Sequence, residues 1–132
     1  MKAIIVDDER LARNELKRLL ENFPSIEVIG EASNTDEASQ LIEELQPDVA
    51  FLDIQMPGKT GFEWLEEWDG FLPEIIFTTA FDEYALKAFE VNALDYVLKP
   101  IELARLSDSI QKLESRFKRT VTSDKTTSAS HV

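Results

Sequence analysis

The feature that most restricts the fold of this chain is an alternation of two patterns. Five short apolar segments are each followed by a segment with helix-like spacing of apolar residues. The apolar segments are 2–6, 26–32, 49–54, 74–79 and 94–98. The helical patterns are 11–23, a segment that begins after Asn34 and ends before Pro47, 62–68, 82–91 and 102–118. Parallel strands need crossover connections of this kind, and solid apolar strands suit a sheet covered on both faces. The alternation predicts an α/β fold of (βα)5 order with a doubly wound, five-stranded parallel sheet.

Charge and composition exclude several classes of protein. The 26 acids outnumber the 14 Lys and Arg, for a net charge of −12, which argues against nucleic-acid binding by this domain itself. The chain has no cysteine and one histidine, His131, so disulfides, thiolate nucleophiles and His-rich metal sites are not expected. No apolar run approaches the roughly 20 residues that span a bilayer. We therefore expect a cytoplasmic domain without membrane contact.

The chain is expected to hold one domain and a tail. Residues 1–119 carry the alternating pattern, whereas 120–132 are rich in Ser and Thr and are interpreted as a linker or tail. At the start of the second helix, Asn34 and Glu37 have the spacing of a capping box.

Ligands of doubly wound sheets bind outside the carboxyl ends of the strands. This rule selects a small set of polar side chains without any further assumption. They are Asp7, Asp8, Asp53, Thr78, Thr79 and Lys99. The set combines three acids, two hydroxyls and one cation at one edge of the sheet.

The chemistry of this set indicates phosphoryl transfer. Three carboxylates repel one another by roughly 4 kcal/mol per pair at about 4 Å and an effective dielectric of about 20, so they need a cation. Oxygen ligands without nitrogen or sulfur favour Mg²⁺ (or Mn²⁺) over zinc. Lys99 and Thr79 can each bind a phosphoryl oxygen, and an aspartate carboxylate can serve as the nucleophile.

Each residue also has a purely structural interpretation. Asp7 and Asp8 could be a helix N-cap pair, Lys99 could be a solvated turn lysine, and the threonines could be ordinary strand residues. Asp53 is harder to explain in this way, because an unpaired acid within an apolar strand is costly to bury. The occurrence of all of them at the ends of successive strands favours a functional site.

The motifs at these positions resemble those of the CheY-like receiver domain of two-component response regulators, over about residues 1–118. The motifs are Val6-Asp7-Asp8-Glu9, Phe51-Leu52-Asp53-Ile54-Gln55-Met56-Pro57-Gly58 with Gly61, Thr78-Thr79-Ala80 and Tyr96-Val97-Leu98-Lys99-Pro100. The segment 77–100 looks particularly like receivers of the LytTR group. Those receivers usually precede a DNA-binding domain, which is absent here.

The resemblance implies a flavodoxin-like fold and a role for each site residue. Asp53 would be the phosphoacceptor and would take the phosphoryl group from a phosphohistidine of a sensor histidine kinase. Asp8 would ligate Mg²⁺ directly, Asp7 would act partly through water, and the backbone carbonyl of Gln55 would be a further ligand. Lys99 would pair with Asp53 and then with the phosphoryl group.

The resemblance also implies a switch. Thr79 would be the switch hydroxyl, Tyr96 would turn inward when Thr79 moves, and the Lys99–Pro100 bond would be cis. Gln55 and Phe81 occupy positions that line the path of attacking water in this family. Phe81 either shields the acyl phosphate and slows its hydrolysis or only packs on the next helix.

The expected partners follow from the same resemblance. Tyr84, Phe89, Tyr96 and either Leu103 or Leu106 can form an apolar patch for a homodimer on the fourth helix, fifth strand and fifth helix. The apolar residues of the last helix have heptad spacing, which fits either a core-facing helix or a short coiled extension. Control of transcription would then pass through a LytTR-type DNA-binding domain beyond this chain.

Two other functions stay open at this stage. A small Mg²⁺-dependent phosphatase or phosphotransferase of the dehalogenase type also uses an aspartate nucleophile at a strand end. That family requires a second acid two residues later, where this chain has Gln55, and the chain lacks room for a cap domain. A receiver-like interaction module that ignores phosphorylation would be expected to lose one of the acids or Lys99. The favoured function is a phosphorylation switch rather than a turnover enzyme.

Overall fold

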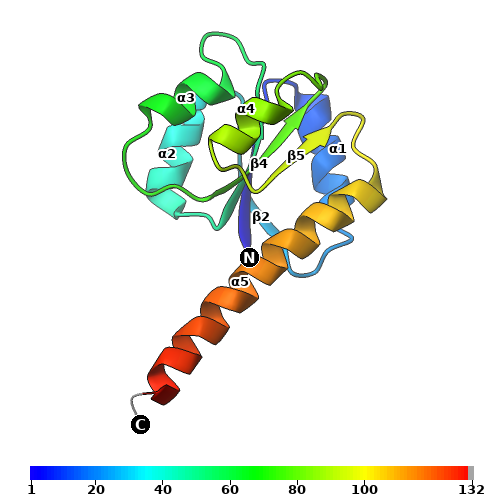
Figure 1. The fold of residues 1–132 in the computed structure, drawn as a ribbon. Coiled ribbons are helices and arrows are strands. Elements are labelled where there is room, and N and C mark those ends of the chain that lie inside the picture. The colour runs from blue at the N-terminus through cyan, green and yellow to red at the C-terminus, as the bar shows by residue number, and fades with distance from the viewer. Residues whose placement is uncertain (131–132) are drawn as a thin grey trace.

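The computed structural model describes the backbone of residues 1–130 and the side chains of residues 1–118. A five-stranded sheet of order β2-β1-β3-β4-β5 forms its centre, and every strand pair is parallel. The strands are β1 (Lys2–Val6), β2 (Glu27–Ala32), β3 (Val49–Asp53), β4 (Glu74–Thr79) and β5 (Asp95–Leu98). The predicted doubly wound α/β sheet is therefore confirmed (Figure 1).

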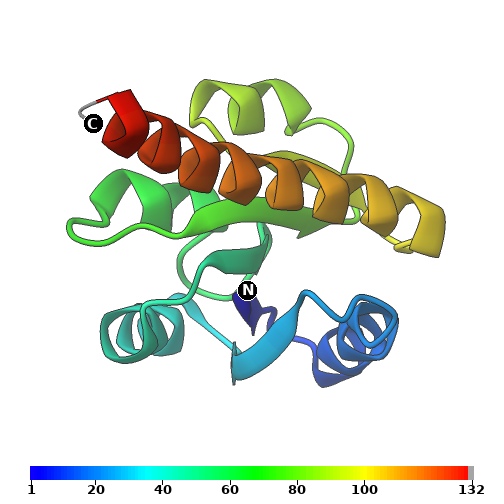
Figure 2. The same cartoon turned by 90° about the horizontal axis from the view of Figure 1, so that it is seen from below.

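Helices cover both faces of this sheet (Figure 2). They are α1 (Arg10–Leu20), α2 (Thr35–Leu45), α3 (Gly61–Glu67), α4 (Ala85–Glu90) and α5 (Leu103–Ser130). The side chains of α1 and α5 pack in one core cluster, and those of α2, α3 and α4 pack in the other. Alternate strand residues supply the two clusters, as Phe51 and Leu52 of β3 show, because successive side chains of a strand point to opposite faces.

The last helix is longer than the sequence predicted. We expected it to end at Lys118, whereas α5 continues to Ser130 and projects away from the sheet (Figure 1). No Gly or Pro lies between these positions to end the helix. Its apolar residues Leu106, Ile110 and Leu113 lie in the core, so α5 is a core-facing helix in this part. The histidine and the valine of the predicted tail, 131–132, lie outside the described residues.

Three local predictions also need correction. The first helix ends at Leu20 rather than at 23, before the Pro24 that was expected to stop it. The fourth helix begins at Ala85 rather than at 82, because the backbone of Tyr84 is not helical. Asn34 caps α2 as predicted and accepts a hydrogen bond from the Glu37 amide at 2.8 Å. The Glu37 side chain instead binds the Ser33 backbone amide at 3.1 Å, one residue before the position that the capping box required. Among the helices that the structure describes, none combines the length and hydropathy needed to cross a bilayer.

Candidate functional site

The three acids meet at the carboxyl ends of the two central strands. Asp7 and Asp8 directly follow β1, and Asp53 is the last residue of β3, which pairs with β1. Carboxylate oxygens of all three lie within 4.8 Å of one another. Asp7 and Asp53 are buried and Asp8 is exposed, so the cluster opens to solvent on one side. The sequence rule for parallel sheets therefore placed this cluster correctly.

Lys99 supplies the cation opposite the acids. Its Nζ lies 2.7 Å from Asp7 Oδ2 and 3.4 Å from Asp53 Oδ2. The backbone amide of Lys99 donates to the Thr79 carbonyl at 2.7 Å, which fixes the end of β5 against the end of β4. Burial alone would lower the pKa of the Lys99 ammonium, but bonds to Asp7 and the charge of Asp53 raise it above its ordinary value. Lys99 is therefore a charged member of the site and not a solvated turn lysine.

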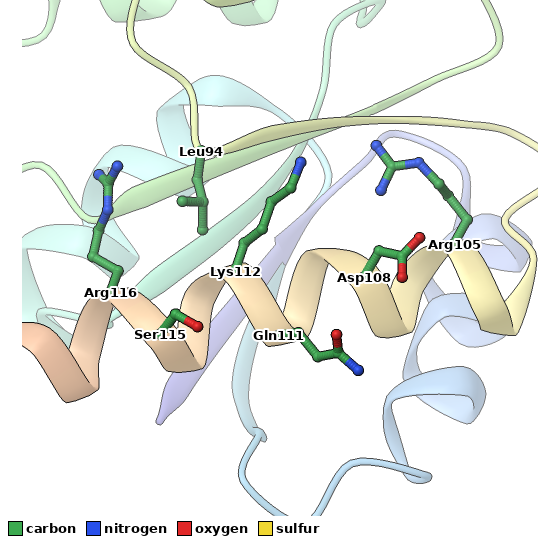
Figure 3. Close-up of a pocket in the computed structure, with 7 residues that line it drawn as sticks. All are labelled: Leu94, Arg105, Asp108, Gln111, Lys112, Ser115 and Arg116. Carbon is green, nitrogen blue, oxygen red and sulfur yellow. The ribbon is translucent and has the colours of Figure 1, made fainter.

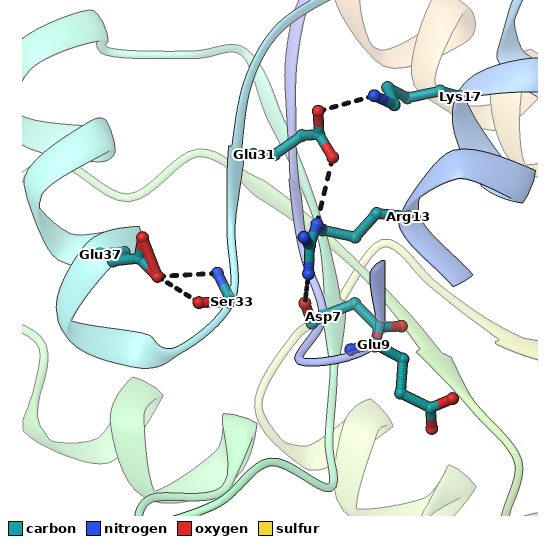
Figure 4. Close-up of polar contacts among 7 residues, drawn as sticks. All are labelled: Asp7, Glu9, Arg13, Lys17, Glu31, Ser33 and Glu37. Atoms are coloured by element: carbon teal, nitrogen blue, oxygen red, sulfur yellow. Dashed lines mark hydrogen bonds and ion pairs between the residues drawn. The ribbon is translucent and has the colours of Figure 1, made fainter. Parts of the chain in front are cut away.

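Asp7 is held in place by the start of α1 (Figure 4). Its Oδ1 accepts a hydrogen bond from the Glu9 amide at 2.9 Å, and its carbonyl accepts one from Arg13 Nη1 at 2.7 Å. Arg13 Nε in turn donates to Glu31 of β2 at 3.1 Å. The N-cap of α1 is Glu9, whose side chain makes no capping hydrogen bond. The acids after β1 are thus not the N-cap pair of α1, and Arg13 is a supporting residue that the sequence did not indicate.

Asp53 carries an unusual carboxyl group. Burial is the largest influence and raises its pKa to about 6, the charge of Asp7 adds to this, and Lys99 opposes it. Above that pH, the carboxylate is ionised, poorly hydrated and close to other charges. A buried acid with a perturbed pKa beside further charged groups marks a candidate functional site.

Thr79 and Tyr96, the predicted switch residues, both bind the loop that follows β4. Thr79 is fully buried, and its Oγ1 accepts a hydrogen bond from the Phe81 amide at 3.2 Å. The Tyr96 hydroxyl donates to the Phe81 carbonyl and accepts from the Tyr84 amide at 3.3 Å. Thr79 and Tyr96 therefore contact the same short loop from two sides. The Lys99–Pro100 peptide bond beside them is cis.

Gln55 connects the acid cluster to this loop. Its amide donates to Asp53 Oδ1 at 3.4 Å, and its side-chain Nε2 donates to the Tyr84 hydroxyl at 2.7 Å. The sequence placed Tyr84 only in a possible dimer patch. No sequence pattern predicts its contact with Gln55. The two residues lie on different loops, which are brought together by the pairing of β3 with β4.

An open pocket of about 730 Å³ lies along α5, away from the acid cluster (Figure 3). Its basic residues are neutralised from within the domain. Arg105 Nη2 and Lys112 Nζ lie 2.8 and 3.3 Å from Asp95, and Arg116 lies 3.0 Å from Glu74. The pocket therefore offers little net charge to a ligand, and the acid cluster remains the candidate site.

The family is decided by a comparison with known protein families. Residues 3–111 match the model of the response regulator receiver domain. This chain belongs to that family. The receiver resembles a response regulatory protein of Vibrio cholerae, with 50% identity over 120 residues that cover 90% of this chain and 51% of the relative. It also resembles the transcriptional regulatory protein BtsR of Escherichia coli, with 49% identity over 123 residues that cover 92% and 52% of the two chains.

Solved structures agree with the family. The response regulatory domain of mrkE from Klebsiella pneumoniae superposes with a TM-score of 0.81 and 34% identity, over 90% of this receiver and 99% of that chain. The REC domain of AraT from Geobacillus stearothermophilus gives a TM-score of 0.80 and 31% identity, over 90% and 96%. The receiver spans about half the length of the curated relatives that it matches. Activities of those whole proteins therefore reach this chain only as proposals.

The donor atoms of the receiver suit a hard divalent cation. The cluster of Asp7, Asp8 and Asp53 presents only oxygen ligands, and its atoms lie close enough for one ion to contact several of them. Oxygen ligands of this kind favour Mg²⁺ or Mn²⁺. The chemistry of the acidic pocket therefore fits the ion that the family implies.

Proposed function

We propose that this receiver takes a phosphoryl group from the phosphohistidine of a sensor histidine kinase onto Asp53. One observation carries the proposal: the buried Asp53 carboxylate lies within reach of two further acids and 3.4 Å from the Lys99 ammonium. Such a cluster provides a nucleophile, a cation site and a positive charge in a single pocket. A structural ion pair would need only one acid and one base.

Asp8, Asp53 and the backbone carbonyl of Gln55 would hold Mg²⁺ (or Mn²⁺), with Asp7 acting through water. The ion supplies positive charge that neutralises the acids and the phosphoryl oxygens when it is bound. The exposure of Asp8 on the open side of the cluster supports this arrangement, because solvent and the phosphodonor enter from there.

The residues of the chain perform the transfer by position and charge. A carboxylate oxygen of Asp53 attacks phosphorus while the phosphorus–nitrogen bond to the donor histidine breaks. The electron pair of that bond returns to the imidazole, which takes a proton from solvent. Lys99 then shifts from the acids to a phosphoryl oxygen, and Thr79 donates its hydroxyl hydrogen to another. The receiver is thus a phosphoacceptor rather than a turnover enzyme.

The same contacts would switch the partner-binding surface. Rotation of Thr79 toward the phosphoryl group breaks its bond with the Phe81 amide and frees the loop that Tyr96 also holds. To move a two-state equilibrium from 1:99 to 99:1, these contacts must favour the active state by about 5.5 kcal/mol. A few charge-assisted hydrogen bonds are of that order.

The output would be dimerisation and control of transcription. Leu86 and Phe89 of α4 are 72% and 79% exposed, and Leu103 of α5 is 44% exposed, whereas Leu106 lies in the core. This apolar surface supports a homodimer through α4, β5 and α5. DNA binding would belong to a LytTR-type domain in the full-length protein and not to this acidic receiver. The proposal places the switch in the cytoplasm, where kinases form phosphohistidine from ATP.

Acetyl phosphate with Mg²⁺, followed by intact mass measurement, tests the proposal. The wild type should gain one phosphoryl group, which EDTA prevents. Asp53→Asn should gain none, whereas Asp69→Asn, the same change at an exposed loop acid, should behave as the wild type. No addition to the wild type, or an undiminished addition to Asp53→Asn, would overturn the proposal. Turnover of small phosphate esters would support the phosphatase alternative instead.

A further inference from the structure

Tyr84 joins two loop positions that flank the phosphoacceptor. Gln55 lies two residues after Asp53, and Phe81 lies two residues after Thr79, on the loops that follow the adjacent strands β3 and β4. Tyr84 contacts both of them: its hydroxyl binds Gln55 Nε2 at 2.7 Å, and its ring meets the Phe81 ring edge-on. These three side chains form one connected group, which we call the rim.

The ring of Tyr84 is fixed by its neighbours. Its centroid lies 6.2 Å from that of Phe81 at an interplanar angle of 81°, and 5.9 Å from that of the buried Phe62. Aromatic pairs in such arrangements are favoured by the ring quadrupoles in addition to the buried area. The hydroxyl is therefore presented to Gln55 from a rigid support.

Hydrogen bonds connect the rim to Asp53 on one side and to Thr79 and Tyr96 on the other. The Gln55 amide binds Asp53, and the Tyr84 amide binds the Tyr96 hydroxyl. Phe81 links the remaining residues: its carbonyl accepts a hydrogen bond from the Tyr96 hydroxyl, and its amide donates one to Thr79. This path crosses from the loop after β3 to the loop after β4 at the bond from Gln55 Nε2 to the Tyr84 hydroxyl, so removal of that hydroxyl releases the Gln55 side chain.

We propose that Tyr84 is a positioning residue that slows the loss of the phosphoryl group by holding Gln55 beside Asp53. The inference rests on the proposed function, because it concerns the hydrolysis of phosphorylated Asp53. In that step a water oxygen attacks phosphorus and the bond from phosphorus to the Asp53 oxygen breaks. The electron pair returns to the carboxylate, and the proton of the water passes to solvent. Tyr84 binds the Gln55 side chain and packs on Phe81, and the Gln55 side chain held in this way restricts the space through which the water approaches. A released Gln55 side chain opens that space.

The test compares phosphorylation and its decay in the wild type and three variants, with one further variant as a control. Wild type, Tyr84→Phe, Gln55→Ala and the double variant are phosphorylated with acetyl phosphate and Mg²⁺, the donor is removed, and intact mass follows the decay. Tyr84→Phe keeps the ring and removes only the hydroxyl. Each single variant should lose the phosphoryl group about two- to tenfold faster, the range that corresponds to one net hydrogen bond. Glu90→Gln, an exposed change at the end of α4, is the matched control and should decay as the wild type.

A double-mutant cycle separates positioning from a general structural effect. If Tyr84 acts through Gln55, the double variant should decay no faster than Gln55→Ala alone. Multiplied rates, or an unchanged rate for Tyr84→Phe, would overturn the inference while leaving phosphorylation of Asp53 intact. A wild type that gains no phosphoryl group would instead overturn the proposed function, so the two failures are distinguishable.

Discussion

The ammonium of Lys99 lies closer to Asp7 than to Asp53. Nζ is 2.7 Å from Asp7 Oδ2 and 3.4 Å from Asp53 Oδ2. The resemblance had implied a pair between Lys99 and Asp53, and it had assigned Lys99 no bond to Asp7. In the observed arrangement Lys99 partly neutralises the same acids that would hold a divalent cation, so a bound cation would compete with the ammonium for one cluster.

Removal of this ammonium should strengthen Mg²⁺ binding. Lys99→Met deletes a positive charge next to Asp7 and Asp53, and we expect the Kd for Mg²⁺ to fall roughly three- to tenfold at about pH 8 by Coulomb's law. Phosphorylation by acetyl phosphate should nevertheless become slower, because a phosphoryl oxygen loses its cationic partner. Isothermal titration calorimetry measures the first effect and intact mass the second.

Lys118→Met provides the matched control, since it makes the same charge change at an exposed position of α5. Its Mg²⁺ affinity should stay within twofold of the wild type, because salt screens exposed charges beyond about 8–10 Å. Weaker Mg²⁺ binding by Lys99→Met than by wild type would contradict the competition.

The raised pKa of Asp53 predicts a pH-dependent cost to stability. Its pKa of about 6 in the folded chain exceeds the ordinary value of about 4, so ionisation of Asp53 destabilises the fold as the pH rises through this window. Without Mg²⁺, Asp53→Asn should therefore be more stable than wild type by about 1–3 kcal/mol at pH 7–8. The difference should vanish below about pH 4, where the wild-type carboxyl is protonated in both states. Urea unfolding in EDTA at several pH values measures it, and a constant difference would count against the assignment.

Asp95 should contribute strongly to the attachment of α5. Burial alone would raise the pKa of its carboxyl, but hydrogen bonds from Arg105, Ser109 and the Tyr96 amide outweigh this and hold the pKa well below its ordinary value. Asp95→Ala leaves Arg105 and the buried Ser109 without this partner and should cost about 2–4 kcal/mol at pH 7.

The contribution of Asp95 to stability depends on pH in the opposite direction to that of Asp53. Because the folded pKa of Asp95 is depressed, its contribution is complete above about pH 4 and declines as the pH falls below that value. Urea unfolding should show a smaller difference in the free energy of unfolding between wild type and Asp95→Ala at pH 3 than at pH 7. Asp108→Ala, at an exposed position of the same helix, should change stability by no more than about 0.5 kcal/mol. An equally large loss in Asp108→Ala would show that the effect is not specific.

The exposed apolar surface of α4 should mediate association of the active receiver. With Mg²⁺ and beryllofluoride as a phosphoryl analogue, sedimentation should show a dimer for wild type and a monomer for Phe89→Asp. Leu11→Asp introduces the same charge at a leucine of α1 that is 77% exposed, and it should still dimerise. Dimerisation of Phe89→Asp, or its loss in Leu11→Asp, would place the interface elsewhere.

Sequence reasoning reached the fold and the acid cluster because both follow from local patterns. Alternating strands and helices require parallel crossovers, and the carboxyl ends of parallel strands lie at one edge. Asp7 and Lys99 follow their strands directly and Asp53 ends its own strand, so their meeting needed no knowledge of side-chain packing. The end of α5 was predicted wrongly, because a Ser- and Thr-rich composition is only a weak guide where no Gly or Pro ends the helix.

The contacts of Arg13, Tyr84 and Asp95 were decided only by the tertiary structure. Arg13 donates a hydrogen bond to Glu31 of β2, and Gln55 donates one to the Tyr84 hydroxyl from another loop. Asp95 accepts hydrogen bonds from Arg105 of α5. These partners are separated in sequence by 18, 29 and 10 residues. Periodicity reports which face of an element is buried, whereas a hydrogen bond depends on distances of about 3 Å between side chains that only the packed sheet and helices bring together.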